Sequence, residues 1–345
     1  MRIALAGLGT AVSRGHLPAI ARLASEGILT VVGAADPDVQ RRARVGASLP
    51  ATPLFESAEA MLASITCDVL VVAADPGVHA DLVVLGLERG LHVVCEKPLV
   101  LTRVGYDRVA KAHARRLDLG LVSVHQYRYS PTWTAMSRCA WLAARLHLPF
   151  ALVVDVKREG VDPLAASPWR SDIELSGGIL ADHGVHYLAL AWMVDQHLDV
   201  LAGSRTANAT GERSGASVRI GSGALTIQAS TGNAVRRTQV TLHVANVGLR
   251  WRDEAFDVVV AGRTVLSRPV ATLADRSHVD ALYEHLYRDL VRNLARPAWR
   301  GHRTAEALAV GRALLVLLDL TSASAAAGSD PVNLGSASRP RPEHR

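Results

Sequence analysis

Short apolar runs alternate with segments of helical spacing over the first 124 residues of the chain. The apolar runs predict strands at residues 2–6, 29–35, 68–73, 91–95 and 119–124. The segments between them predict helices at residues 17–25, 58–64, 79–89 and 103–116. Strands that are apolar throughout are typical of a parallel sheet covered by helices on both faces. The pattern therefore predicts an α/β domain with a doubly wound parallel sheet over residues 1–124.

A different pattern begins at about residue 125. Longer strands, in which polar and apolar residues partly alternate, are predicted at 150–157, 223–230, 239–245 and 256–260. No helical segment separates the last three strands, which favours an antiparallel sheet. Helices are predicted at 182–194, 279–294 and 304–320. We therefore expect a C-terminal α+β domain with a mostly antiparallel open sheet over residues 125–320, followed by a disordered Ser-, Ala-, Gly- and Pro-rich tail at 321–345.

Composition excludes several classes of protein. The 345 residues are 49% hydrophobic and 20% charged, which is typical of a globular chain with a large core. The three cysteines form no Cys-x-x-Cys pair, which favours a reducing compartment and argues against a structural zinc site. No apolar run approaches the ~20 residues that a membrane span needs. Gly7 interrupts the first apolar run too early for a signal peptide. We expect a cytoplasmic protein with no membrane partner.

The basic charge of the chain does not indicate a nucleic-acid partner. The formal net charge is +6, but the basic residues are scattered, and the densest cluster, Arg41-Arg42-Ala43-Arg44, has no aromatic residues among it. We interpret this cluster as the solvated face of a helix. Only three of the 38 cationic residues are lysines. Because arginine cannot replace a compact amine, the three lysines, Lys97, Lys111 and Lys157, are candidate functional residues.

A glycine turn joins the first predicted strand to the first helix. In Gly7-Leu8-Gly9-Thr10-Ala11-Val12, two glycines permit a tight turn and a close approach of the backbone to a pyrophosphate at the helix N-terminus. Asp36 ends the second strand, where a carboxylate binds ribose hydroxyls and repels a 2′-phosphate. Taken alone, Asp36 fits equally well as a helix N-cap. Turn and carboxylate together predict a dinucleotide-binding Rossmann domain.

Lys97 follows the predicted strand at 91–95, in the sequence Cys95-Glu96-Lys97-Pro98. Ligands of open parallel sheets bind beyond the carboxyl ends of the strands, so a lysine there can reach a cofactor and a substrate oxygen. The peptide bond before Pro98 can be cis. The alternative interpretation is an ordinary surface lysine in a loop. The position and the scarcity of lysine favour a functional residue.

A third motif lies in the run from Gly177 to His186. Asp182 and His186 are four residues apart, so on one helix they share a face and can form a hydrogen bond. A carboxylate-oriented imidazole is a common general base. His183 points elsewhere. A metal site built from these three residues lacks a further ligand, and we expect none. The remaining alternative is a capped helix with a histidine in the core.

These motifs occur in the order found in the Gfo/Idh/MocA oxidoreductases, and the chain resembles this family from Met1 to about Leu320. The resemblance rests on the glycine turn, His16-Leu17-Pro18-Ala19, Pro76-Gly77-Val78-His79-Ala80, Glu96-Lys97-Pro98, Tyr127-Arg128-Tyr129-Ser130-Pro131, Trp169-Arg170 and Gly177–His186. It implies a Rossmann domain followed by an open sheet that carries the substrate. It also implies a homo-oligomer, a dimer or a tetramer, formed through that C-terminal sheet.

The resemblance assigns roles to individual residues. The catalytic positions fall on Lys97, Asp182 and His186. The cofactor-binding positions fall on Gly7, Gly9, Thr10, Ala11, Asp36, Ala74, Asp75, His79, Glu96 and Lys97. The substrate-binding positions fall on His125, Arg128, Trp169, Arg170 and His183. Four departures from the family pattern concern the cofactor and the substrate pocket: Val12 in place of a small residue, Ala74-Asp75 in place of Thr-Pro, His125 in place of Asn and Ala189 in place of Asp.

We expect an NAD(P)-dependent dehydrogenase or reductase that acts on a secondary alcohol or ketone of a sugar, sugar derivative or cyclitol. His186 would take the hydroxyl proton, Lys97 would stabilise the oxygen, and Asp182 would orient His186. We expect NAD as the cofactor, with NADP as the alternative, and no metal. The competing interpretations are an enzyme acting on a non-sugar substrate, such as an imine or a trans-diol, and a non-catalytic dinucleotide sensor.

Overall fold

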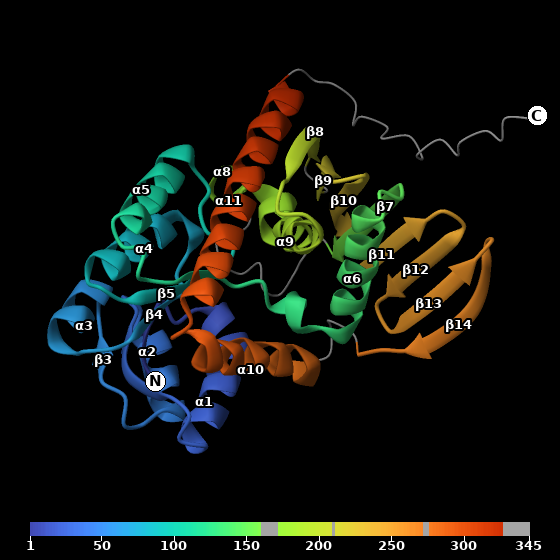
Figure 1. Cartoon of the computed structure of the whole chain (residues 1–345). Helices are drawn as coiled ribbons and strands as arrows, with labels where there is room; N and C mark the ends of the chain where they lie inside the picture. Colours follow the sequence, from blue (N-terminus) through green and yellow to red (C-terminus); the bar gives the residue numbers. More distant parts are fainter. Residues whose placement is uncertain (160–171, 209–210, 272–275, 327–345) are drawn as a thin grey trace, which may run out of the picture.

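The computed structural model describes residues 1–159, 172–208, 211–271 and 276–326. Two sheets lie side by side, with helices between them (Figure 1). The first sheet contains six parallel strands in the order β3-β2-β1-β4-β5-β6. Its strands are β1 (Arg2–Ala6), β2 (Thr30–Ala35), β3 (Leu54–Phe55), β4 (Val69–Val72), β5 (His92–Cys95) and β6 (Leu121–Ser123). This order confirms the predicted doubly wound Rossmann sheet.

Helices cover both faces of the first sheet. They are α1 (Leu17–Ser25), α2 (Val39–Ser48), α3 (Ala58–Ser64), α4 (His79–Glu88) and α5 (Arg103–Ala114), with a 3₁₀ turn η2 (Pro76–Val78) before α4. A π-helical turn, η1 (Val12–His16), leads into α1. The ends of α1 and α3 agree with the sequence prediction, because each has a clear apolar stripe at helical spacing.

The second sheet contains eight strands in the order β14-β13-β12-β11-β7-β10-β9-β8. Every neighbouring pair is antiparallel except β7 and β10, which run parallel. The mostly antiparallel sheet is thus confirmed. Its strands are β7 (Phe150–Glu159), β8 (Asp199–Asn208), β9 (Gly211–Ile220), β10 (Gly223–Asn233), β11 (Arg237–Val244), β12 (Val247–Arg252), β13 (Ala255–Val260) and β14 (Arg263–Pro269).

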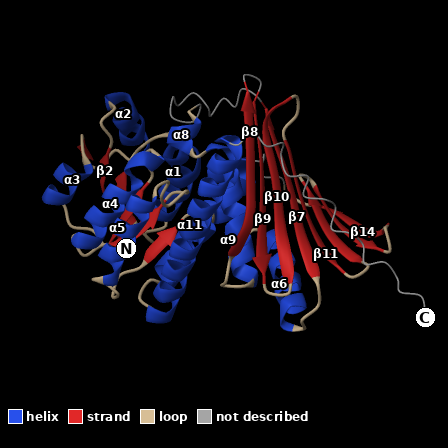
Figure 2. Cartoon of the chain, turned by 90° about the horizontal axis from the view of Figure 1, so that it is seen from above, coloured by secondary structure: helices blue, strands red, loops and turns tan. Residues whose placement is uncertain are grey.

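Helices pack on the face of the second sheet that looks toward the first domain (Figure 2). No described helix covers the opposite face. The helices of the second half are η3 (Gln126–Tyr129), α6 (Pro131–Arg145), α8 (Ile173–Ser176), the π-helical η5 (Leu180–Gly184), α9 (Val185–Val194), α10 (Arg276–Asn293) and α11 (Pro297–Ala326). The core between them and the sheet is built from α6, α9 and the inward-facing strand residues.

The last two helices return to the first domain. Helix α10 places Tyr283 and Tyr287 in the core around α1, far from the sheet that precedes it in sequence. Helix α11 runs between the two sheets (Figure 1). Its residues Ala307 and Leu315 belong to the core beside α5, and Leu314 belongs to the core of the second sheet. One helix therefore joins the two cores.

Helix α11 is longer than the sequence pattern predicts. It begins at Pro297 rather than 304 and continues to Ala326, so residues 321–326 are helical instead of part of a disordered tail. The rest of the predicted tail lies outside the described residues. Contrary to our expectation, α11 is long and apolar enough to cross a membrane by length and composition alone. The packing of α11 against β6, β8 and α9 accounts for this composition, because the helix contributes apolar side chains to two different cores.

Candidate active site

The glycine turn lies at the carboxyl end of β1, at the centre of the first sheet. Gly7 has a φ of +88°, and a Cβ atom there would lie 2.3 Å from the backbone nitrogen of Ala74. Only glycine permits this approach of the loop after β4. Gly9 borders open space, since an added Cβ would meet only the Arg41 side chain at 3.8 Å.

The unusual residue Val12 is accommodated at the start of the helical segment that follows the turn. Val12 is fully buried in the core beneath the sheet and starts the π-helical turn η1. A π turn holds one residue more than an α turn, so η1 accommodates one extra residue between the glycines and His16. The first-turn backbone N–H groups at Thr10 and Ala11 have no intrahelical acceptors. The turn thus fits a pyrophosphate, which the N–H groups and the helix dipole would hold.

Asp36 braces the glycine turn from the end of β2. Its carboxylate accepts hydrogen bonds from the backbone N–H of Leu8 (2.7 Å) and of Asp38 (2.8 Å). Asp38, rather than Asp36, is the N-cap of α2, which removes the N-cap interpretation of Asp36. Arg41 Nη1 lies 3.6 Å from the same carboxylate. The position beside the turn is the one that a ribose-binding carboxylate occupies in this fold.

His79 joins the loops that follow β4 and β5. Its Nδ1 lies 2.8 Å from the carbonyl oxygen of Pro98, and its Nε2 lies 3.0 Å from that of Ala74. Burial lowers the pKa of His79, so the ring is neutral near pH 7 and donates to one of the two carbonyls. The buried His79 therefore holds together the two loops at the carboxyl ends of β4 and β5. Asp75, in the first of these loops, is exposed.

A buried network that the sequence analysis missed surrounds Glu96. The Tyr283 hydroxyl donates to Glu96 Oε1 (2.8 Å), and His16 Nε2 lies 3.0 Å from the same oxygen. His16 Nδ1 lies 2.6 Å from the Tyr287 hydroxyl. Burial alone would raise the pKa of Glu96, but His16, Lys97 and Tyr283 together lower it to about 2. No local signal reveals this network, because its members are separated by up to 271 residues.

Lys97 reaches from the end of β5 to the helix of the second domain. Its Nζ donates to Asp182 Oδ1 (2.5 Å) and to the backbone carbonyl of Asp182 (2.6 Å). Its backbone N–H donates to Glu96 Oε2 (3.1 Å), and the peptide bond to Pro98 is cis. The structure thus brings together two of the three residues to which the sequence assigns catalysis.

The expected hydrogen bond between Asp182 and His186 is not among those that join the described residues. Asp182 lies in the π-helical turn η5, where the i→i+5 pattern displaces it from the α-helical face on which His186 would meet it. Asp182 instead binds Lys97, and His186 Nδ1 is buried without a hydrogen-bond partner. The two side chains remain electrostatic neighbours.

His186 lies in an apolar, aromatic environment. Its ring packs against Tyr127 at 4.3 Å and faces the edge of His125 at 6.2 Å, measured between ring centroids. Burial, reinforced by the charge of Lys97, holds the pKa of His186 well below its usual range. Burial likewise lowers the pKa of His125 to about 4, and both of its ring nitrogens lack hydrogen-bond partners. Both imidazoles are neutral near pH 7, so each can accept a proton.

The other residues to which the sequence assigns substrate binding have varied positions. Arg128 forms a buried ion pair with Glu306 of α11, so its guanidinium supports the fold rather than opening on a pocket. His183 lies beside Asp182 (3.6 Å between Nε2 and Oδ2) and contacts Arg158. Trp169 and Arg170 lie outside the described residues. No group of three or more His, Cys, Asp or Glu side chains in the described part of the chain is placed to hold a metal ion.

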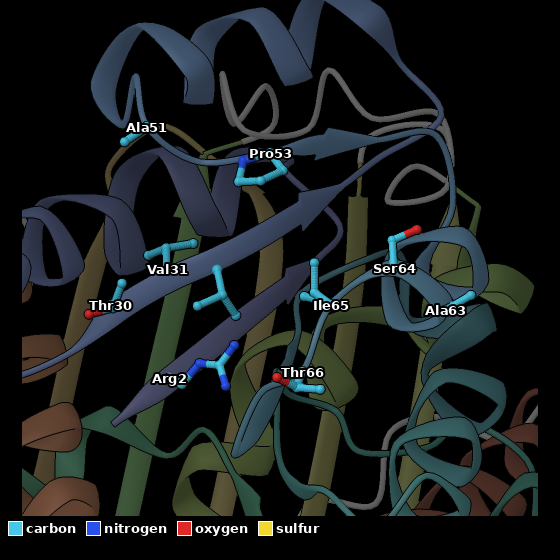
Figure 3. A pocket seen from close by; sticks show the side chains of 10 residues that line it. Arg2, Thr30, Val31, Ala51, Pro53, Ala63, Ser64, Ile65 and Thr66 are labelled. Carbon is cyan, nitrogen blue, oxygen red and sulfur yellow. The ribbon is translucent and has the colours of Figure 1, made fainter.

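A separate cavity of about 590 Å³ lies at the opposite edge of the first sheet, between the starts of β1 and β2 and the end of α3 (Figure 3). Arg2 is the only charged side chain among the residues that line it. Because ligands of such sheets bind at the carboxyl ends of the strands, this cavity is remote from the chemistry.

The comparisons with known proteins support the Rossmann domain most directly. Residues 1–123 match the family described as "Oxidoreductase family, NAD-binding Rossmann fold" (GFO_IDH_MocA). The match covers the first domain of the chain. This result confirms the NAD-binding Rossmann character of the first domain and agrees with the predicted resemblance to this family.

Individual relatives cover the chain in part. D-xylose 1-dehydrogenase (NADP(+)) 2 of Haloferax volcanii is 31% identical over 45% of this chain and 46% of its own length. Trans-1,2-dihydrobenzene-1,2-diol dehydrogenase of Xenopus laevis is 30% identical over 37% of each chain. The chain thus spans less than half the length of these curated relatives. An oxidoreductase from Agrobacterium radiobacter, solved with NAD+, L-tartaric acid and magnesium, shares the fold over 95% of this chain and 97% of its own (TM-score 0.77, 16% identity).

Proposed function

We propose that this protein is a Gfo/Idh/MocA oxidoreductase that uses NAD and acts on a secondary alcohol or ketone of a sugar, sugar derivative or cyclitol. The observation that carries the proposal is the pairing of Lys97 with Asp182, next to the buried His186, at the carboxyl edge of the NAD-binding sheet. An ammonium group and a neutral imidazole are the two groups that removal of a hydride and a proton from an alcohol requires.

The side chains divide the reaction between them. The neutral His186 takes the hydroxyl proton of the substrate in the oxidative direction. Lys97 holds the same oxygen and stabilises its developing negative charge, while Asp182 fixes the ammonium group in place. Bound NAD supplies the hydride acceptor. The residues of the glycine turn would hold the pyrophosphate, and Asp36 would hold the adenosine ribose.

The test is a nicotinamide absorbance screen over sugars, cyclitols and sugar nucleotides with NAD and NADP. We expect turnover of at least one sugar-class substrate by the wild type and not by Lys97→Ala. Turnover confined to trans-diols or imines would instead favour an enzyme that acts on a non-sugar substrate. The similarity to trans-1,2-dihydrobenzene-1,2-diol dehydrogenase supports this second candidate. NADH binding without turnover of any substrate class would indicate a dinucleotide sensor.

We further propose that NAD is preferred to NADP. The Asp36 carboxylate repels a 2′-phosphate, and Arg41, 3.6 Å away, offsets part of that repulsion. Arg42 is already engaged with the backbone carbonyls of Asp36 and Pro37, so it supports the loop. Titration of nicotinamide fluorescence should show tighter binding of NADH than of NADPH. The reverse order would mean that Arg41 dominates.

We also propose a cytoplasmic homo-oligomer, a dimer or a tetramer, formed through the second sheet. The support for this assembly is that no described helix covers the outer face of that sheet. Light scattering of the purified protein tests the oligomeric state, and a monomer at micromolar concentration would contradict the proposal.

A further inference from the structure

A buried arginine that the mechanism does not use lies next to the candidate site. Arg158 sits near the end of β7, where the alternation of the strand places it on the same face as Val154 and Val156, toward the helices. It is only 5% exposed. No carboxylate among the described residues lies within 4.0 Å of its guanidinium. A charge removed from water without a counter-charge is costly, so its retention calls for an explanation.

The hydrogen bonds of Arg158 occupy only part of the guanidinium. Nη1 donates to the carbonyls of Lys157 and Arg237 and to the Thr238 hydroxyl, at 2.9–3.2 Å. Nε donates to His183 Nε2 (3.2 Å). The remaining nitrogen, Nη2, lies 3.4 Å from His183 Nδ1. A neutral imidazole that accepts at Nε2 carries its proton on Nδ1, so Nη2 has no acceptor there.

His183 connects this guanidinium to the catalytic group. Its Nε2 lies 3.6 Å from Asp182 Oδ2, and Asp182 binds Lys97. Burial lowers the pKa of His183, and the charges of Arg158, Lys97 and Arg236 lower it further, while the charge of Asp182 opposes this shift. Among the described residues, Asp182 thus contacts both His183 and Lys97, and the Arg158 guanidinium lies on the other side of the same imidazole.

We infer that Arg158 is a specificity-determining residue that binds a carboxylate of the substrate. This inference rests on the proposed function, since it adds an acidic group to the sugar or polyol that Lys97 and His186 would oxidise. A carboxylate oxygen can accept from the N–H groups of Nη2, and the carboxylate supplies a counter-charge that no described residue within 4.0 Å of the guanidinium supplies. The preferred substrate class is therefore a sugar acid or hydroxy acid rather than a neutral sugar.

The experiment compares D-glucuronate with D-glucose, which differ at one carbon by a carboxylate in place of a hydroxymethyl group. Binding of each to the NAD-loaded protein is measured by calorimetry, so that the result does not depend on turnover. We expect glucuronate to bind at least ~10-fold more tightly than glucose, because a hydrogen bond between two charged groups is stronger than one between neutral groups. Arg158→Gln should remove this difference. Arg158→Lys should keep part of it, since a lysine retains the charge without the planar fork.

Arg237→Gln is the matched control. Arg237 pairs in register with Lys157, so its exposed side chain lies on the opposite face of the sheet, and its loss changes the net charge equally. This variant should keep the preference for glucuronate. Equal binding of the two sugars by the wild type, binding of neither, or a preference that survives in Arg158→Gln would overturn the inference. Failure of the proposed function looks different: glucuronate would bind through Arg158, and no sugar or polyol would be oxidised.

Discussion

Lys97 connects two networks that meet at the end of β5. Behind it, Glu96 is held ionised by His16 and Tyr283. In front of it, Asp182 accepts from its ammonium group. The lysine is thus fixed at both its backbone and its tip, which positions a charge without the entropy that a free surface lysine retains.

Replacing Lys97 by alanine should abolish catalysis and leave the fold intact. In the proposed reaction the ammonium group stabilises the developing alkoxide, and the loss of such a group lowers kcat about 10²–10³-fold. Its ion pair with Asp182 is partly open to solvent, so its contribution to stability is small. Kinetics and thermal denaturation of the same variant separate the two effects. Wild-type turnover by Lys97→Ala would remove the residue from the mechanism.

The pH profile of oxidation should follow His186. Because burial lowers the pKa of His186, the imidazole stays neutral down to acidic pH, and kcat/KM should fall only below pH 6.5 as the base becomes protonated. The charge of Asp182 favours the protonated ring, so Asp182→Asn should move the fall to still lower pH. Profiles of the two proteins provide the test. A midpoint above pH 6.5 in the wild type would point to another ionising group.

Among the elements, the helix that carries Asp182 and His186 depends on a carboxylate from β9. Glu212 accepts from the backbone N–H of Ile179 (2.9 Å), which directly precedes η5, and from the hydroxyl of Ser214 on its own strand (2.6 Å). Gly178, with a φ of +69°, leaves room for that carboxylate, since a Cβ there would lie 2.5 Å from it. The sheet of the second domain therefore sets the position of the segment that carries Asp182 and His186.

Glu212→Ala should destabilise the protein by about 1–3 kcal/mol, because it leaves a buried N–H and a buried hydroxyl without their acceptor. It should also lower kcat through misplacement of Asp182. Ser214→Ala serves as the control, since it removes one hydrogen bond and keeps the cap on Ile179. Denaturant unfolding and kinetics of both variants test the effect. Equal behaviour of the two would show that the cap is not what positions the helix.

Local periodicity explains which elements the sequence could reveal. Five of the six strands of the first sheet are apolar runs, and their parallel arrangement follows from the alternation with helices. The sequence pattern did not reveal β3, β8, β9, β12 and β14. Strand β3 has only two residues, β8 and β9 are rich in polar and small residues, a glycine and two arginines interrupt the apolar residues of β12, and every residue of β14 is exposed. Helix α6 had a usable signal, namely Pro131 at its first position and buried residues at helical spacing.

The sequence could predict a residue of the candidate site only where that residue stands in a recognisable local motif. Lys97 and Asp182 stand in recognisable motifs. The predicted strand at 150–157 stopped one residue short of Arg158. Every second residue of β7 is buried, and Arg158 continues this alternation, which was the available signal. The partners of Glu96 come from α1 and α10, and no periodicity joins elements so distant in sequence.

At the scale of the whole molecule, buried neutral histidines make the fold sensitive to acid. His79, His125 and His186 are buried, and burial lowers the pKa of each. In the unfolded chain they titrate near 6.5, so unfolding takes up protons below that pH and stability is lost as pH falls. For His125, with a pKa of about 4, the loss between pH 6.5 and pH 5 is about 2 kcal/mol.

Thermal denaturation from pH 7.5 to pH 5 should therefore show a falling Tm. Glu96, whose folded pKa is about 2, adds to the loss only below about pH 4.5, so it does not disturb this range. His125→Asn should show a shallower fall, since it removes one of the contributing groups. A flat profile in the wild type would contradict the assignment of these rings as neutral.

The position of α11 has a consequence for how the protein comes apart. Its opposite faces complete two different cores, so neither sheet can lose this helix without exposing apolar surface in the other half as well. The NAD-binding half and the half with the eight-stranded sheet should consequently melt in a single cooperative transition, although their strand topologies would suit two independent units. The same coupling makes a hinge between the halves costly. We therefore expect a substrate to reach Lys97 without a large opening motion between the NAD-binding half and the half with the eight-stranded sheet.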